Sequence, residues 1–156
     1  MDKKDENVKV LATNRKARHE YHILEKYEAG LVLTGTEVKS LRQGKVSLAD
    51  SYGAVKNGEV FLKGMHIAAY SQGNRENHEP TRERKLLLNK REIRKLFIKS
   101  EERGFTIIPL KVYFKGSYAK VELAVAKGKH LYDRREDIKK RDAERETRRA
   151  KKLNQY

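Results

Sequence analysis

The sequence predicts a mainly β protein, a small antiparallel barrel with helices packed on it and a basic C-terminal tail. Three observations predict this fold class. Strand-like segments are joined by tight turns, two helix-capping signals lie between them, and the run after Ala126 has no apolar cluster that could add to a core. An open α+β sheet is the structural alternative.

The first expected strand is "HEYHILEKY", residues 19–27. Its polar and apolar residues alternate imperfectly, but its aromatic and β-branched residues favour a strand. The segment 51–67 is expected to form a β-hairpin, because Asn57-Gly58 stands between apolar-rich flanks and both residues tolerate positive φ.

A second hairpin is expected over residues 105–125, with "KGS" as its turn. Its two strands would each place one apolar face on the core, formed by Ile108, Leu110, Val112 and Phe114 before the turn and by Ala119, Val121, Leu123 and Val125 after it. Pro109 has no N–H, so its strand should lie at a sheet edge or carry a bulge there.

Two helices are predicted from capping boxes, Asn89 with Glu92 and Thr34 with Glu37. The apolar residues that follow each cap would face the core: Ile93, Leu96 and Phe97 in one helix, Val38 and Leu41 in the other. Short antiparallel strands with helices between them are typical of a small closed barrel of the oligonucleotide-binding type, which leaves one face and its loops free for nucleic acid.

Charge narrows the class of partner. The chain of 156 residues is long enough for one domain and an arm, and it carries a formal net charge of +15. Such an excess favours a polyanion, because each cation placed on a phosphate releases condensed counterions. No apolar run reaches the length of a membrane span and no N-terminal signal pattern is present, so no membrane partner is expected.

The sequence contains little that predicts catalysis or metal binding. Without cysteine the chain has neither disulfides nor thiolate metal sites, which fits a cytoplasmic location. It has no Gly-x-Ser-x-Gly elbow and no Gly-rich phosphate loop. His19 and His22 would lie on opposite faces of a strand, with no carboxylate cluster nearby, so we expect no metal site and no cofactor.

Two basic stretches predict RNA binding. "TNRKARHEYHI", residues 13–23, places cations beside Tyr21, and "RERKLLLNKR", residues 82–91, places cations around three leucines. Cations fix phosphates and planar groups stack on unpaired bases. The alternative is a basic surface that flanks a core strand, with Leu86 and Leu88 simply buried. Glu28 is then either an exposed acid in a turn or an acceptor for the exocyclic amine of a base.

Four longer stretches, "NRKARHEY", "AGLVLTGTEVKSLRQGKVSLADSY", "PTRERKLLLNKREI" and "KVELAVAKGKHLYDRREDIKKRD", occur in this order between Asn14 and Asp142. They closely resemble the bacterial small protein B family (SmpB), the SsrA-binding proteins of trans-translation. The resemblance implies an oligonucleotide-binding barrel that binds the tRNA-like domain of transfer-messenger RNA (tmRNA). It does not extend to the first residues or to residues 71–79.

The resemblance also implies a cellular role. Proteins of this family deliver tmRNA, together with elongation factor Tu and GTP, to a ribosome stalled without a codon in its A site. The protein takes the place of the missing anticodon stem, and the ribosome then switches to the tag-coding frame of the tmRNA. No catalytic activity is implied, and we expect the working form to be a monomer.

Particular residues match the family's RNA-binding positions. Glu28, Leu87 and Lys120 match positions associated with tmRNA binding, where Lys120 would be a cation on a barrel strand, Leu87 an apolar platform and Glu28 the only acidic acceptor. The other matched positions are Asn14, Lys16, Arg18, His19 and Asn89.

A second matched group is implied to lie in the ribosomal decoding centre: Gly128, Lys129, His130 and Tyr132, followed by Asp133, Arg134 and Arg135. There Tyr132 offers a ring to stack on a base of 16S rRNA, and Lys129 offers a charge for phosphate. The family motif often reads Gly-Lys-Lys, whereas the third residue here is His130, whose neutral imidazole is a weaker phosphate anchor.

The organisation that follows has an N-terminal arm (1–13), an RNA-binding barrel domain (14–127) and a basic tail (128–156). From residue 127 on, the chain has 12 Lys or Arg against 6 Asp or Glu, with a thin apolar stripe. That stripe cannot offset an ordering entropy of roughly 1–2 kcal/mol per residue. We expect the tail to be disordered when free and helical on the ribosome, along the mRNA channel.

Three functional classes follow. The leading class is the RNA adaptor of ribosome rescue. The second is a general module that binds structured RNA without a ribosomal role. The third, an RNA-modifying enzyme or nuclease, is disfavoured because no catalytic constellation is present.

Overall fold

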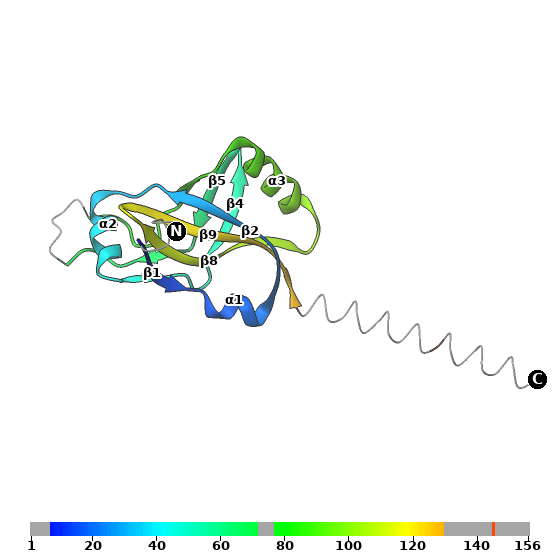
Figure 1. Ribbon diagram of the computed structural model, residues 1–156, viewed down its shortest axis with the longest axis horizontal. Coiled ribbons are helices and arrows are strands. Elements are labelled where there is room, and N and C mark those ends of the chain that lie inside the picture. The colour runs from blue at the N-terminus through cyan, green and yellow to red at the C-terminus, as the bar shows by residue number, and fades with distance from the viewer. Residues whose placement is uncertain (1–6, 72–76, 130–144, 146–156) are drawn as a thin grey trace, which may run out of the picture.

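The computed structural model describes residues 7–71, 77–129 and 145 (Figure 1). The strands and helices in these residues are, in chain order, β1 (Val8–Thr13), α1 (Arg15–Glu20), β2 (Tyr21–Leu31), α2 (Gly35–Arg42), β3 (Val46–Ser47), β4 (Tyr52–Lys56), β5 (Glu59–Lys63), β6 (His66–Ile67), β7 (Arg84–Leu87), α3 (Lys90–Glu101), β8 (Phe105–Lys115) and β9 (Tyr118–Gly128). Strands β3 and β6 form a small separate sheet.

Six strands close into a barrel. They pair antiparallel in the order β8-β4-β5-β7-β2-β9, and β9 pairs back with β8. Strand β1 lies outside this ring and pairs with β8 from Lys111 to Lys115, whereas β8 meets β4 at Ile107. The predicted small antiparallel barrel is therefore confirmed, and the open sheet considered as its alternative is wrong.

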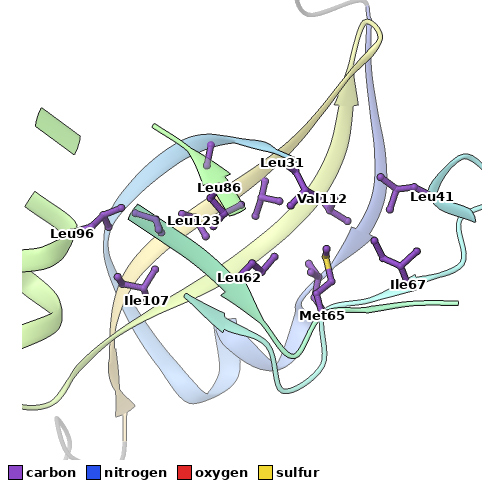
Figure 2. Close-up of a cluster of buried hydrophobic side chains, with 14 of the residues drawn as sticks. Leu31, Leu41, Leu62, Met65, Ile67, Leu86, Leu96, Ile107, Val112 and Leu123 are labelled. Atoms are coloured by element: carbon purple, nitrogen blue, oxygen red, sulfur yellow. The ribbon is translucent and has the colours of Figure 1, made fainter. Parts of the chain in front are cut away.

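Apolar side chains fill the barrel (Figure 2). Leu62 of β5 and Leu123 of β9 lie in the middle of this cluster and are fully buried. Leu96 of α3 and Leu41 of α2, also fully buried, lie towards opposite ends of it (Figure 2). The two capped helices therefore each add a leucine to one end of the barrel core, which burial of apolar surface stabilises.

A bulge in β8 makes the predicted apolar face of this strand partly wrong. The register of β8 against β9 shifts between Pro109 and Lys111, as predicted for a proline that cannot donate to the ladder. The bulge splits the face that was expected to be continuous. Val112 and Phe114 belong to the barrel core, whereas Ile108 and Leu110 pack in a second cluster with Ala17, Ala124 and Ala126 on the outside of the barrel.

The predicted turns and caps are confirmed. Asn57 and Gly58 have φ angles of 53° and 74°, as a tight hairpin turn requires. In α3 the amide of Glu92 donates to Asn89 Oδ1 at 2.8 Å, and the amide of Asn89 donates back to Glu92 Oε1 at 3.2 Å. In α2 the amide of Thr34 donates to the Glu37 carboxylate at 2.9 Å.

Three other features differ from the sequence prediction. Residues 15–20 form helix α1, so His19 lies on a helix and β2 begins only at Tyr21. The N-terminal arm contains β1, a strand that no pattern predicted. Phe97 was expected on the core face of α3 but is 49% exposed, while Leu96 alone of that helix is fully buried.

An ion pair inside the protein ties α2 to β7. Glu37 and Arg84 are both fully buried, and Arg84 Nε donates to the Glu37 carboxylate. The Arg84 guanidinium also donates to the carbonyls of Met65 (2.6 Å) and Pro80 (3.0 Å). Burial works to raise the pKa of Glu37, but hydrogen bonds from Arg82, Thr34 and Arg84 outweigh it and lower the pKa to about 2. Arg84, part of the predicted RNA-binding stretch, is therefore committed to the fold.

Candidate nucleic-acid interface

A row of residues in register crosses four barrel strands and continues onto β1. Leu87 of β7 pairs with Gly30 of β2, Gly30 with Lys120 of β9, Lys120 with Tyr113 of β8, and Tyr113 with Val10 of β1. Directly opposed residues of antiparallel strands point to the same side of a sheet. Leu87 is 54% exposed, so this side faces outward, and we call the outward side of β2, β9 and β8 around this row the outer face.

Glu28 lies on the outer face, two residues before Gly30, and its carboxylate is held from two sides. The hydroxyl of Tyr113 donates to Glu28 Oε2 at 2.5 Å, and Lys115 Nζ lies 3.4 Å from the same carboxylate. The Tyr113 hydrogen bond is the main cause that lowers the pKa of Glu28; burial opposes it, while Lys115 and Lys120 add to it. Glu28 is thus a fixed, ionised acceptor.

Tyr113 is the buried support of this acceptor. The residue is only 5% exposed, and burial raises the pKa of its hydroxyl, with further contributions from the hydrogen bond and the charge of Glu28. The hydroxyl therefore keeps its proton at neutral pH, where it donates to the carboxylate and orients it on the outer face.

A second carboxylate lies on the same face and corrects the expectation that Glu28 is the only acid there. Glu122 is directly opposite Glu28 in the β2–β9 ladder. Like charges at opposed positions destabilise a sheet. Here Lys26 (3.8 Å) and Lys111 (3.6 Å) flank the carboxylate of Glu122, so its charge is balanced within the protein while Glu28 keeps the more open position.

Leu87 rests on Gly30. A Cβ atom placed at Gly30 would lie 3.3 Å from the Cβ of Leu87, closer than nearly all such contacts. The missing side chain at Gly30 therefore leaves room for Leu87 to lie flat over β2. The result is an exposed apolar platform next to Lys120 and Glu28.

Helix α1 covers the other end of the outer face, below β8 and β9 in Figure 1. Its Ala17 packs with Ala124 and Ala126, which follow Lys120 and Glu122 at every second position of β9 and so lie on the same face. The same side of the barrel therefore carries the exposed Lys16, Arg18 and His19 of this helix.

Two of the predicted RNA-binding residues, Asn14 and Asn89, use their side chains to cap helices. Asn14 caps α1, accepts from the amide of Ala17 at 3.3 Å, and donates to the carbonyl of Pro109 at 3.0 Å. It thereby fixes α1 to the bulge of β8. Asn89 uses its Oδ1 to cap α3.

The junction with the tail is described only at its start. Gly128 is the last residue of β9, pairs with Tyr21, and a Cβ atom there would meet no neighbour within 4 Å. Lys129 follows it and is partly buried. His130, Tyr132, Asp133, Arg134 and Arg135 lie outside the described residues, as does the predicted order–disorder behaviour of the tail.

Sequence reasoning missed four outer-face residues. Lys111, Tyr113 and Lys115 alternate with the buried Val112 and Phe114, and Tyr118, which is 72% exposed, stands two residues before Lys120. For the first three of these residues, the alternation of polar and apolar positions in "KVYFK", residues 111–115, was the available signal.

Other classes of site do not appear in the part of the chain that the structure describes. Within those residues no three His, Asp or Glu side chains gather as metal ligands. None of the helices there is long and apolar enough to cross a membrane.

Comparison with known proteins gives consistent results. A family model described as "SmpB protein" matches residues 11–153. The SsrA-binding protein of Carboxydothermus hydrogenoformans is 62% identical over 142 residues, which cover 91% of this chain and 95% of that protein. The SsrA-binding protein of Halothermothrix orenii is 57% identical over 150 residues, covering 96% and 97%.

A solved structure agrees with these relatives. It is described as "tmRNA-SmpB: a journey to the center of the bacterial ribosome", and one of its chains is 52% identical to this one with a TM-score of 0.65. The match covers 75% of this chain and 82% of that chain.

Proposed function

The chain belongs to the SmpB protein family, and on this premise we propose that it is an RNA-binding adaptor of ribosome rescue. It binds the tRNA-like domain of tmRNA and delivers that RNA to the empty A site of a stalled ribosome, where trans-translation tags the nascent chain. The relatives named SsrA-binding proteins and the structure that contains tmRNA, SmpB and the ribosome support this partner.

One observation carries the proposal at the level of residues. Glu28, Leu87 and Lys120, which the family resemblance selects from distant parts of the chain, lie together on the outer face through the register of β7, β2 and β9. A cation, a fixed carboxylate and an exposed apolar side chain at one spot supply three different kinds of contact that a folded RNA offers.

The roles divide by chemistry. Lys120 and Lys115 neutralise phosphates, which gives affinity with little sequence preference. Glu28 accepts from an exocyclic amine of a base, and a carboxylate that is already oriented by Tyr113 has less freedom to lose on binding. Leu87 supports the face of an unstacked base or a sugar. Lys16, Arg18 and His19 of α1 extend the phosphate contacts along the same side.

The tail is the part that acts on the ribosome. Gly128 and Lys129 stand where β9 leaves the barrel, and the residues from His130 on contact 16S rRNA in the decoding centre and the mRNA channel, where the tail becomes helical. Elongation factor Tu with GTP joins through the tmRNA complex. The protein works as a cytoplasmic monomer and has no catalytic activity of its own.

Truncation separates the two parts. A chain that ends after Lys129 keeps β9 complete, whereas an end at Ala126 would remove the pairs that Tyr21 and His22 make with Gly128 and Lys127. We expect the shorter chain to bind the tRNA-like domain with the affinity of the full chain and to lose tagging of nascent chains in a reconstituted translation system. Equal loss of RNA affinity would contradict this division. Full tagging without the tail would show that the tail is not the part that acts on the ribosome, whereas RNA binding without tagging by the full chain would favour a general RNA-binding module.

A further inference from the structure

A second surface lies away from the outer face, between α3 and the β4–β5 hairpin. An open groove of about 410 Å³ is lined there by Val55, Gly58, Lys90, Ile93, Arg94 and Phe97. In Figure 1, α3 lies beside β4 and β5, on the side of the barrel away from α1. The floor of the groove is formed by Val55 and Ile93, which pack against the barrel core.

The groove exposes an aromatic ring. Phe97 is 49% exposed although it follows the fully buried Leu96, so the ring lies on the flank of α3 and not beneath it. Gly58 forms part of the opposite wall at a φ of +74°, and a Cβ atom there would meet nothing within 4 Å. The ring therefore borders an open groove whose opposite wall carries no side chain at Gly58.

Two cations line the groove beside the ring. Lys90 and Arg94 are exposed, and neither makes an ion pair with any residue that the structure describes. The neighbouring acids are engaged: Glu59 lies 3.1 Å from Lys85, and Glu92 accepts from the amide of Asn89. The groove is thus electropositive with an apolar floor.

This combination fits single-stranded nucleic acid. Proteins bind unpaired strands by stacking bases on aromatic rings while cations follow the backbone. A ring in a groove cannot reach the bases of an A-form duplex, whose major groove is deep and narrow. From residue 127 on, the chain carries 12 Lys or Arg against 6 Asp or Glu, and a second copy would bring the same basic α3, so like charge disfavours both the tail and a second copy as occupants.

We propose that the groove between α3 and the β4–β5 hairpin binds a single-stranded RNA segment, with a base on Phe97 and phosphates on Lys90 and Arg94. This rests on the proposed function only in taking RNA as the partner. It adds a second RNA contact beside that of the outer face.

The test uses the full chain and two RNA probes, a short single-stranded oligouridylate and the tRNA-like domain of tmRNA. Phe97→Ala should weaken binding of the oligouridylate by about tenfold, because one stacked base is lost. Arg94→Gln should also weaken this binding, because one phosphate contact is lost. Ile98→Ala is the matched control, because Ile98 is equally exposed (53%) on the same helix but lines a different groove with Tyr27 and Lys95. All three variants should bind the tRNA-like domain as the unchanged chain does.

Chemical shifts of the Val55 and Ile93 methyl groups localise the binding. They should move when the oligouridylate is added at physiological ionic strength and should stay fixed when a duplex of the same length is added. If Phe97→Ala does not fold, Arg94→Gln and these methyl shifts carry the test, because Arg94 is exposed.

The proposal fails if Phe97→Ala and Arg94→Gln leave oligouridylate binding unchanged, or if RNA binds without moving the two methyl groups. It also fails if polyglutamate moves them and RNA does not, because the groove is then a site for acidic protein. Failure of the proposed function looks different: the unchanged chain would not bind the tRNA-like domain at all.

Discussion

The hydroxyl of Tyr113 on β8 is predicted to raise the RNA affinity of the protein by orienting the carboxylate of Glu28 on β2. Tyr113→Phe removes the hydroxyl that donates to Glu28 Oε2 at 2.5 Å and leaves the ring in place. A hydrogen bond to a charged group contributes roughly 1.5–3 kcal/mol. The Glu28 side chain is 42% exposed, so water replaces part of that bond. We therefore expect a loss somewhat below that range, about 1 kcal/mol or roughly fivefold in Kd for the tRNA-like domain.

The assay is a double-mutant cycle by fluorescence anisotropy at one fixed salt concentration, because phosphate contacts make every affinity salt-dependent. In a Glu28→Ala background, Tyr113→Phe should change nothing further, since the hydroxyl then has no carboxylate to orient. Tyr27→Phe is the matched control: its hydroxyl also donates to a glutamate, Glu25 at 2.5 Å, but its ring packs towards the barrel core. An equal loss from Tyr113→Phe in both backgrounds would refute the reasoning.

The same pair gives a pH prediction. The pKa of Glu28 is held below its usual value mainly by the Tyr113 hydrogen bond. In Tyr113→Phe the pKa should rise towards the usual value, so the weakening of RNA binding by acid should begin at a higher pH than in the unchanged chain. A titration of the Glu28 side-chain carbon by NMR measures this directly; an unshifted curve would show that other groups hold the charge.

Further predictions concern the platform, the buried ion pair and a cap. Gly30→Ala should displace the side chain of Leu87 and lower RNA affinity several-fold, while the free energy of unfolding changes by less than about 1 kcal/mol; RNA titration and urea unfolding check both. Glu37→Gln leaves Arg84 buried without a counter-charge and should cost roughly 3–5 kcal/mol at pH 7 in urea unfolding. Because the pKa of Glu37 is lowered from 4.5 to about 2, its stabilisation is present above pH 4.5 and is lost as pH falls towards 2; the Gln variant should lack that acid-sensitive part. Asn89→Ala should destabilise by about 1 kcal/mol through the lost cap, and Asn89→Ser should restore both stability and RNA affinity if the residue acts through α3 alone.

Local signals in the sequence were sufficient where the physics is local. The caps at Thr34 and Asn89 and the turn at Asn57-Gly58 depend on residues within three positions of each other, and all are present. Helix α1 has a local cap at Asn14, but its six residues give no apolar period and no capping box that would predict a helix. It is fixed from far away, by Asn14 on the carbonyl of Pro109, 95 residues later in the chain.

The face assignments depended on long-range register. Pro109 correctly predicted an edge or a bulge, but sequence alone could not show that the bulge turns Leu110 away from the barrel core. Phe97 has the spacing of a core residue and yet lies half exposed, because the core of the barrel end is already filled by Leu96.

The candidate site was predictable only in part for the same reason. The resemblance to a family pointed to Glu28, Leu87 and Lys120, but nothing in their spacing brings them together; the pairing of β2 with both β7 and β9 does. Neither the family resemblance nor the residue spacing pointed to Tyr113. Its role depends on a hydrogen bond to a residue 85 positions away, which alternation along β8 only makes possible.

The most direct test of the proposed RNA site is the chemical-shift footprint of the tRNA-like domain on the isotopically labelled protein. We expect the largest amide shifts at five positions of the site, both in the full chain and in the chain that ends after Lys129: Glu28, Gly30, Leu87, Tyr113 and Lys120. Largest shifts on the β3–β6 pair or at α2, with the outer face unmoved, would contradict it.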